Sequence, residues 1–370
     1  MPENLPDFTL LVKPASGDCN LHCEYCFYAC KCLLYPDGHR RMTETTLRQM
    51  VASYFSHPQT SYTFAWQGGE PTLMGLDFYK TAVQIQNELK PLSSVVSNVL
   101  QTNGVLLTDE WAKFLHDNHF LVGVSLDGPA ALHDRYRRTV DGRGSQADVV
   151  NALKRLKKHH VETNILTLVS EANYRNAAQI YRYIKDLGFK YHQYIECVEC
   201  DDDNYPLPFS LKPGQWGDFL CQLFDTWYPN DVTTVSIRLF DSIVSRLVTG
   251  RPTVCPMGGN CCNYLVIEHN GDVYPCDFHV LPEWKLGNVS QDNLPDLFAS
   301  PKFLSFGQKK RPDNPNCLTC RYLNLCMADC PKHRRFATDH KSALCQDWIS
   351  FYDHTIDRFE QLAAWVKNRM

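Results

Sequence analysis

The sequence predicts an α/β fold in two parts: a partial, TIM-like (β/α)6 barrel and a smaller cysteine-rich domain after it. Short apolar runs alternate with amphipathic stretches up to about residue 228, the alternation stops near residue 235, and cysteines become denser beyond that point. Alternating strands and helices are typical of α/β domains with a parallel sheet. We therefore expect a first domain of residues 1–235 and a second of residues 236–370.

The six expected strands are short runs of apolar and β-branched residues. They span residues 8–13, 62–66, 95–101, 121–126, 163–169 and 191–196. Helical patterns, with apolar positions three and four residues apart, follow the strands. They include residues 44–56, 109–117 and 147–159, and an amphipathic helix near residues 348–367 closes the chain.

Right-handed crossovers make such strands parallel, in either an open doubly wound sheet or a barrel, and we favour the partial barrel. In both arrangements, ligands bind at the carboxyl ends of the strands. Polar or glycine-rich turns follow three of these ends, at residues 67–71, 101–104 and 125–129. We expect the site there.

The overall charge excludes several classes of partner. Lys and Arg number 37 and Asp and Glu 41, a net charge of -4, which argues against nonspecific binding to nucleic acid or anionic lipid. No basic start leads into a long apolar stretch, and no run approaches the roughly 18 apolar residues of a membrane span. We expect a cytoplasmic protein without a membrane anchor. Its 17 cysteines then point to metal or redox chemistry, because that compartment keeps thiols reduced.

Three cysteines follow the first expected strand closely. Cys19, Cys23 and Cys26 have the spacing Cys-x3-Cys-x2-Cys. A 4Fe-4S cluster takes four cysteine ligands, so three leave one iron open to bind another molecule. The spacing also allows a zinc site completed by His22, Cys30 or Cys32, or a set of inert buried thiols.

Two motifs together resemble the radical S-adenosylmethionine (SAM) enzymes. They are the three-cysteine motif with Tyr25 before its last cysteine, and Gly68-Gly69-Glu70-Pro71 after the second strand. The resemblance implies a barrel of the radical SAM type, whose open iron chelates the amino and carboxylate groups of SAM. It also implies the SAM contacts, which are Tyr25, Gln67, Gly68, Gly69, Glu70, Ser125, Asp127 and Ile195. Taken alone, Ser125 and Asp127 are more typical of turns.

The cysteines of the second domain resemble the SPASM extension of radical SAM enzymes, which holds two auxiliary 4Fe-4S clusters. The resemblance implies three clusters in all. It assigns to the first auxiliary cluster Cys255, Cys261, Cys276 and Cys330, and to the second Cys317, Cys320, Cys326 and Cys345. Cys262 is an alternative to Cys261 as a ligand. A zinc ribbon formed by Cys317 and Cys320 with Cys326 and Cys330 is the alternative.

Segments along most of the chain resemble the anaerobic sulfatase-maturating enzymes. They include KPAS, CEYCFY, FAWQGGEPTLMGLDFY, LQTNG, FLVGVSLDGP, HDRYRR and GDVYPCDFHV. The resemblance implies oxidation of Cys or Ser, within Cys/Ser-x-Pro/Ala-x-Arg of an unfolded sulfatase, to Cα-formylglycine. It places Tyr28 and Gln67 in the substrate pocket and makes Asp277 the base. The implied electron donor is a flavodoxin or ferredoxin. Tyr28 is alternatively a packed aromatic beside the cluster, and Asp277 a solvated loop carboxylate.

Two other functions compete with this interpretation. One is a radical SAM enzyme that forms thioether or other crosslinks in a ribosomal peptide. It would be expected to carry an N-terminal peptide-recognition domain, whereas the first strand here begins within about ten residues. The other is a noncatalytic iron-sulfur or zinc protein, which has no need of a three-cysteine site beside Gly68-Gly69-Glu70-Pro71. Cys197 and Cys200 form a further Cys-x2-Cys, which a redox pair would explain.

Overall fold

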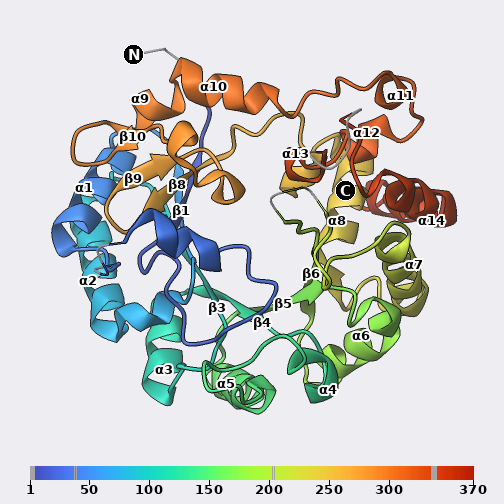
Figure 1. Cartoon of the computed structure of the whole chain (residues 1–370), viewed down its shortest axis with the longest axis horizontal. Coiled ribbons are helices and arrows are strands. Elements are labelled where there is room, and N and C mark those ends of the chain that lie inside the picture. The colour runs from blue at the N-terminus through green and yellow to red at the C-terminus, as the bar shows by residue number, and fades with distance from the viewer. Residues whose placement is uncertain (1–4, 37, 39, 202, 204, 335–339) are drawn as a thin grey trace. The chain divides into compact units, whose positions relative to one another are not determined.

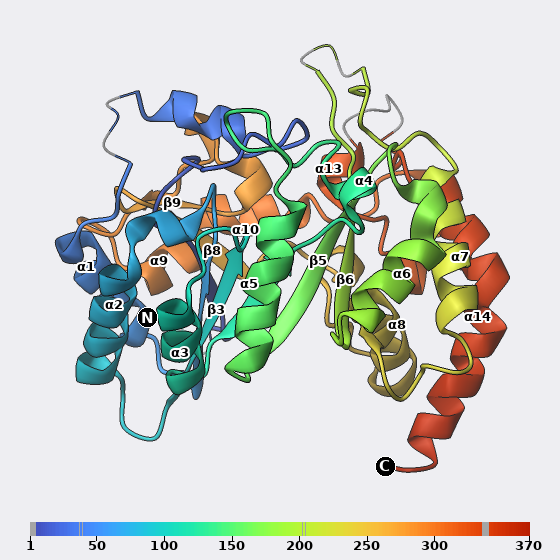
Figure 2. The same ribbon diagram turned by 90° about the horizontal axis from the view of Figure 1, so that it is seen from below.

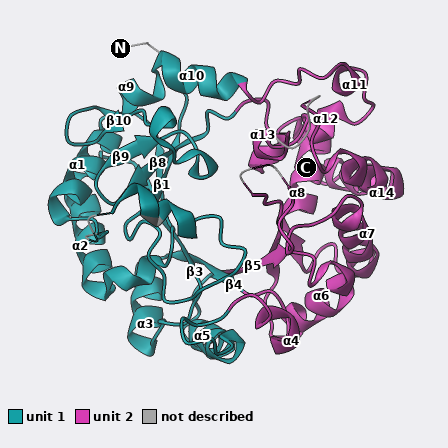
Figure 3. Cartoon of the chain, in the orientation of Figure 1, with its two compact units in different colours: residues 1–125, 138–163, 261–308 teal, residues 126–137, 164–260, 309–370 magenta. Residues whose placement is uncertain are grey.

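A computed structural model describes the chain except residues 1–4, 37, 39, 202, 204 and 335–339. The chain divides into two compact units, each made of three separate segments of the sequence (Figure 3). The first unit contains residues 1–125, 138–163 and 261–308, and the second contains residues 126–137, 164–260 and 309–370. The domains expected from the sequence, residues 1–235 and 236–370, are consecutive segments, and that division stays a prediction.

A mixed sheet forms the centre of the first unit. Its strands are β1 (Thr9–Lys13), β2 (Ser61–Trp66), β3 (Val95–Thr102), β4 (Leu121–Ser125), β8 (Tyr264–Glu268), β9 (Asp272–Tyr274) and β10 (Gly287–Asn288). The order is β10-β9-β8-β1-β2-β3-β4. Strands β1 to β4 are parallel, as predicted, and β8 is parallel to β1, whereas β9 and β10 continue the sheet antiparallel.

Helices of the first unit are α1 (Glu44–Phe55), α2 (Leu76–Leu89), α3 (Asp109–Asp117), α5 (Gln146–Lys158), α9 (Leu294–Phe298) and α10 (Pro301–Gln308). Figures 1 and 2 show α1, α2, α3 and α5 along the sheet. Side-chain caps set where two of them begin: Thr43 accepts from the backbone N–H of Thr46, and Thr108 from that of Trp111. Their apolar faces, such as Leu47 of α1, are buried.

The second unit contains three parallel strands covered by helices. Its strands are β5 (Thr163–Val169), β6 (Tyr191–Glu196) and β7 (Ser236–Ile237). Its helices are α4 (Ala130–His133), α6 (Ala177–Asp186), α7 (Gln215–Trp227), α8 (Arg238–Thr249), α11 (Pro315–Leu318), α12 (Leu323–Cys326), α13 (Pro331–Arg334) and α14 (Cys345–Lys367). Helix α7 packs against α14, where Gly217 donates its N–H to Asp347 Oδ1 at 2.9 Å. A Cβ at Gly217 would lie 3.0 Å from the Asp347 carbonyl oxygen, so glycine permits the close approach.

The six predicted strands are all present, each within one residue of its expected ends. The predicted helices are also present, although α14 begins at Cys345, three residues before the expected start. Strand β8 was not predicted as part of the first sheet, because its partner β1 lies about 250 residues earlier in the chain. Among the residues described, no helix is long and apolar enough to cross a membrane.

Candidate active site

The loop after β1 and the turn after β2 are joined by backbone hydrogen bonds. Gly69 donates its N–H to the Ser16 carbonyl at 2.7 Å, and Glu70 donates to the Asp18 carbonyl at 2.7 Å. A Cβ at Gly69 would lie 2.0 Å from that Asp18 oxygen. Only glycine therefore fits where the turn touches the residue before Cys19. Because these N–H groups bind the loop, the turn would offer carbonyl oxygens to an amino group, as the predicted SAM contact requires.

Glu70 is fully buried and its carboxylate is surrounded by donors. It accepts from the Thr72 N–H at 2.9 Å, the Thr72 hydroxyl at 2.6 Å, the Thr102 hydroxyl at 2.7 Å and the Asn103 N–H at 2.8 Å. Burial raises its pKa, and these hydrogen bonds oppose the shift. Glu70 thus fastens the turn after β2 to the end of β3. A direct SAM contact by Glu70 stays a prediction.

The three cysteines of the first motif lie in this loop and are partly buried. Cys19 Sγ accepts from the Leu21 N–H at 3.4 Å and from Asn103 Nδ2 at 3.7 Å, so donors already surround its sulfur. Burial raises the pKa of Cys19 to about 12. Iron binding would remove that proton, because the thiolate is the ligand. Three soft sulfur donors beside a glycine turn fit an iron-sulfur cluster.

Of the residues offered as alternative ligands to this motif, Cys30 is exposed and its thiol donates to the Phe27 carbonyl at 3.4 Å. His22 is exposed, and its backbone N–H donates to the Arg138 carbonyl. The side chain of Cys32 lies outside what the structure describes. Tyr25 is buried, while Gln67 is half-buried directly after β2, its N–H donating to the Val12 carbonyl at 2.9 Å.

Asp277, the predicted base, is held on both carboxylate oxygens. The Tyr264 hydroxyl donates to Oδ1 at 3.2 Å, and Lys13 Nζ lies 3.8 Å from Oδ2. The side chain is 14% exposed, so the protein does not enclose it completely. Its neighbour Cys276 is also within reach of the Tyr264 hydroxyl, at 3.4 Å from Sγ. The structure thus places Asp277 beside a predicted cluster ligand, with a fixed direction.

Tyr28 lies in the same region, but its side chain is engaged. It is 2% exposed, its hydroxyl donates to the Glu268 carboxylate, and its ring packs with Val266 and Val280. Burial raises the pKa of Tyr28 well above its ordinary value, and Glu268 adds to the shift. These contacts favour the packed-aromatic alternative. Substrate contact by Tyr28 stays a prediction.

Sequence reasoning did not single out Lys13 or Glu268. Both are charged and buried, at 1% and 0% exposed, and they are register partners at the ends of β1 and β8. Lys13 ends a predicted strand of mostly apolar residues, and this position in the sequence could have identified it. Nothing in the sequence placed Glu268 beside it, because the pairing of β8 with β1 is long-range.

The remaining predicted SAM contacts end other strands. In the first unit, Ser125 closes β4 and is 9% exposed. In the second unit, Ile195 lies in β6, and the Asp127 carboxylate accepts from Arg137 Nε at 2.9 Å and from the Leu168 N–H at 2.9 Å. Asp127 therefore has protein partners of the kind typical of a turn residue, and its SAM contact stays a prediction.

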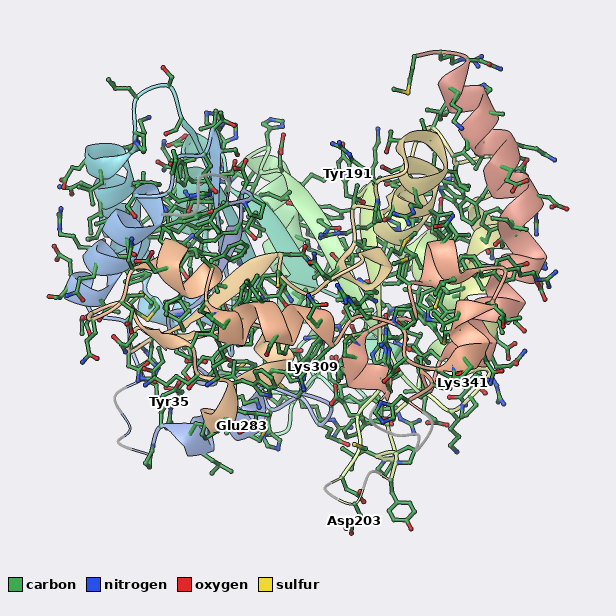
Figure 4. The ribbon with its side chains drawn as sticks, turned by 90° about the horizontal axis from the view of Figure 1, so that it is seen from above. Tyr35, Tyr191, Asp203, Glu283, Lys309 and Lys341 are labelled. Carbon is green, nitrogen blue, oxygen red and sulfur yellow. The ribbon has the colours of Figure 1, made fainter. Side chains whose placement is uncertain are left out.

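Four predicted ligands line one cavity of about 90 Å³ in the second unit: Cys317, Cys320, Cys326 and Cys345. Its other walls are mainly apolar, with Trp348 among them, and Lys341, labelled in Figure 4, is also a lining residue. Burial raises the pKa of Cys326 above the ordinary thiol value. Four thiols that line one apolar cavity fit a fully ligated iron-sulfur cluster. The zinc alternative takes Cys330 in place of Cys345, and Cys330 is not among the residues that line this cavity.

The other four predicted ligands lie two in each unit. Cys261 and Cys276 lie in the first unit and are partly buried, whereas Cys255 is exposed and Cys330 partly buried in the second. Cys262 packs against α10, where its thiol donates to the Phe303 carbonyl at 3.6 Å and a Cβ at Gly307 would lie 2.2 Å from its sulfur. This packing supports Cys261 as the ligand. Cys197, of the possible redox pair, is buried, and burial raises its pKa.

Comparison with known proteins gives two family matches and full-length relatives. Residues 14–184 match the radical SAM superfamily, and residues 255–321 match SPASM, an iron-sulfur cluster-binding domain. A cysteine-type anaerobic sulfatase-maturating enzyme of Clostridium perfringens is 35% identical over 98% of this chain and 100% of its own. A serine-type enzyme of Bacteroides thetaiotaomicron is 36% identical over 97% of this chain and 92% of its own.

Solved structures agree with these matches. Native anSMEcpe with bound AdoMet and Cp18Cys peptide has a TM-score of 0.90 and 35% identity, covering 98% of this chain and 100% of that one. Streptococcus suis SuiB bound to its precursor peptide SuiA has a TM-score of 0.65 and 17% identity over 90% of this chain and 74% of that one, a likeness of fold alone. The matches confirm the predicted fold class, a radical SAM α/β fold followed by a SPASM domain.

Proposed function

The chain belongs to the anaerobic sulfatase-maturating enzymes, radical SAM enzymes with a SPASM domain, and from this premise we propose what it does. It oxidises a Cys or Ser side chain in a sulfatase peptide, Cys/Ser-x-Pro/Ala-x-Arg, to Cα-formylglycine. The observation that carries the proposal is the full-length match, in sequence and in fold, to enzymes of this kind. The substrate is an unfolded sulfatase segment, because the target side chain must reach the reacting centre.

Iron-sulfur clusters and SAM are the cofactors of such an enzyme. When bound, they would supply a 5′-deoxyadenosyl radical able to remove one hydrogen atom from Cβ of the target, and auxiliary clusters that could accept the electron the substrate then loses. We propose three 4Fe-4S clusters. The first is held by Cys19, Cys23 and Cys26, and the others by two sets of four: Cys255, Cys261, Cys276 and Cys330, then Cys317, Cys320, Cys326 and Cys345.

The residues of the chain supply position and proton transfer. The turn at Gly68 and Gly69 lies against the loop of the first cluster and is suited to hold SAM. Asp277 takes the proton from the thiol or hydroxyl of the target. Loss of a hydrogen atom, a proton and an electron leaves a carbon doubly bonded to oxygen or sulfur. For Ser this is the aldehyde, and for Cys water replaces the sulfur and releases hydrogen sulfide.

The electron donor for the first cluster, in this proposal, is a flavodoxin- or ferredoxin-type protein, and the compartment is the cytoplasm. A low-potential one-electron donor suits a cluster that must pass an electron to SAM. A reducing compartment keeps the many thiols available as ligands. The two relatives, one cysteine-type and one serine-type, are almost equally identical to this chain, so overall identity does not choose the target side chain.

Mass spectrometry of two matched peptides tests the proposal. The anaerobically reconstituted protein receives SAM and dithionite with a Cys-x-Pro-x-Arg peptide or its Ser counterpart. We expect at least one peptide to gain an aldehyde that reacts with a hydrazine, which also identifies the preferred target. A peptide that loses two hydrogens without gaining hydrazine reactivity would favour the crosslinking alternative. Absence of SAM cleavage would contradict radical chemistry altogether.

A further inference from the structure

We propose that Lys13 is a positioning residue for Asp277: its buried side chain fixes the direction of the carboxylate that takes the substrate proton. This inference rests on the proposed function, because it concerns the base of that reaction. Lys13 touches neither substrate nor cofactor in this account. It acts through Asp277 alone.

The first support is the path of the Lys13 side chain. Lys13 ends β1 and is 1% exposed, so its ammonium group points into protein. A Cβ at Gly68 would lie 3.3 Å from Lys13 Cδ, so the glycine turn leaves room for the lysine stem. Gly68 has a φ of 134°, which also favours glycine. The turn predicted to bind SAM therefore also determines where Lys13 can lie.

The second support is the arrangement around Asp277. Lys13 Nζ lies 3.8 Å from Oδ2, and the Tyr264 hydroxyl lies 3.2 Å from Oδ1. Each carboxylate oxygen thus has its own partner, from β1 on one side and β8 on the other. Two separate contacts restrict rotation of the carboxylate more than one would. A proton acceptor must be aligned with the group it deprotonates, so this restriction bears on catalysis.

The third support is the way the ammonium group is itself held. Its nitrogen lies 4.2 Å from the centre of the Tyr28 ring, a cation–π distance. Tyr28 donates to Glu268, which is the register partner of Lys13. Burial lowers the pKa of Lys13, while the negative charges of Asp277, Glu268, Cys276 and Cys26 oppose the shift. These groups fix the ammonium in one place, as a residue that positions another requires.

The test compares Lys13→Met, which removes the charge at similar length, with wild type and with Lys80→Met, a lysine on the exposed face of α2. We expect both variants to keep iron content, SAM cleavage and peptide affinity near the wild-type values. Fluorescence anisotropy measures the peptide affinity before reductant is added. In Lys13→Met the aldehyde formed per SAM cleaved should fall about tenfold or more, because small misplacements of reacting groups cost about that much. Lys80→Met should keep the wild-type ratio.

A double variant separates positioning from general support of the fold. If Lys13 acts through Asp277, the double variant Lys13→Met with Asp277→Asn forms as much aldehyde per SAM cleaved as Asp277→Asn alone. A lower aldehyde yield per SAM cleaved in the double variant than in Asp277→Asn would contradict the proposal. Should Lys13→Met fail to retain its clusters, Lys13→Gln, which keeps a polar group near Glu268, is expected to show the same fall in aldehyde per SAM cleaved. A wild-type ratio in either folded Lys13 variant would overturn the role of Lys13.

The same data distinguish this inference from the function on which it rests. Wild-type protein that cleaves SAM but makes no aldehyde contradicts the proposed function and removes the basis of the Lys13 role with it. Wild-type conversion together with unchanged Lys13 variants contradicts the Lys13 role alone.

Discussion

The carboxylates of Glu70 and Asp277 differ in their hydrogen bonds and in their exposure. Glu70 is fully buried and accepts four hydrogen bonds from Thr72, Thr102 and Asn103, so its oxygens are occupied by the protein. Asp277 has two held oxygens and remains 14% exposed. A base must have room to receive a proton, so Asp277 is suited to that role and Glu70 to holding the fold together.

Replacing Asp277 tests this distinction. Asp277→Asn keeps the shape of the side chain and removes its capacity to take a proton. We expect SAM cleavage to continue while aldehyde formation falls about 100-fold or more, within the usual contribution of a positioned base. Chromatography of 5′-deoxyadenosine and mass spectrometry of the peptide measure the two yields. Full turnover by this variant would remove Asp277 from the catalytic residues.

At the scale of elements, the turn after β2 and the loop after β1 form one structure. The contact is backbone to backbone, at Gly69 and Glu70 on one side and Ser16 and Asp18 on the other. A backbone contact of this kind cannot adapt to a larger residue by a change of rotamer. The position of the first cluster motif therefore depends on a turn about 50 residues later in the chain.

Gly69→Ala should disrupt that contact. Its Cβ would lie 2.0 Å from the Asp18 carbonyl oxygen, so the loop before Cys19 must move. We expect SAM cleavage to fall about tenfold or more, since displacement of about 1 Å is costly at a reacting centre. Gly259→Ala is a matched control, because its Cβ would meet Met327 at an ordinary 3.7 Å. Equal SAM cleavage by the two variants would show that the close contact is unimportant.

The packing of α10 predicts which of the two neighbouring residues, Cys261 or Cys262, binds iron. Cys262 contacts Phe303 and lies where any side chain at Gly307 would be, so it is already part of the packing. Iron analysis after reconstitution should show that Cys261→Ala loses up to about four of about twelve irons, given four irons in each of three clusters. Cys262→Ala should keep them. The reverse result would assign Cys262 as the ligand.

Local patterns predicted the elements well, because each strand from β1 to β6 is a short apolar run followed by a periodic helix. They also placed the cysteine motif and the Gly68-Gly69 turn at strand ends. Contacts between distant residues were not predictable in this way. The pairing of β8 with β1 brings Glu268 to Lys13, and no local pattern encodes that register.

At the scale of the whole molecule, buried histidines make stability depend on pH. Burial lowers the pKa of His133 and of His192 to about 4. Between pH 6.5 and 4 the unfolded chain therefore binds more protons than the folded one, and the free energy of unfolding falls as pH falls. Each histidine contributes up to about 1.4 kcal/mol per pH unit in that window. Buried carboxyl groups with raised pKa values, such as Glu70, act in the opposite sense.

His192→Gln isolates one of these contributions. We expect the variant to lose less stability than wild type as pH falls from 6.5 to 4, because it lacks a group that takes a proton on unfolding. Urea unfolding of the cluster-loaded protein under anaerobic conditions gives the midpoints to compare. The same change of urea midpoint with pH in wild type and His192→Gln would contradict a contribution of His192 to this pH dependence.

This chain, as we propose, uses a SAM-derived radical to oxidise Cβ of a sulfatase peptide. The most direct measurement uses a Cys-x-Pro-x-Arg peptide deuterated at Cβ, with its Ser counterpart, and follows the fate of the label. We expect deuterium in 5′-deoxyadenosine and a peptide aldehyde in roughly equal amounts. SAM cleavage that yields unlabelled 5′-deoxyadenosine and leaves both peptides unchanged would contradict this proposal.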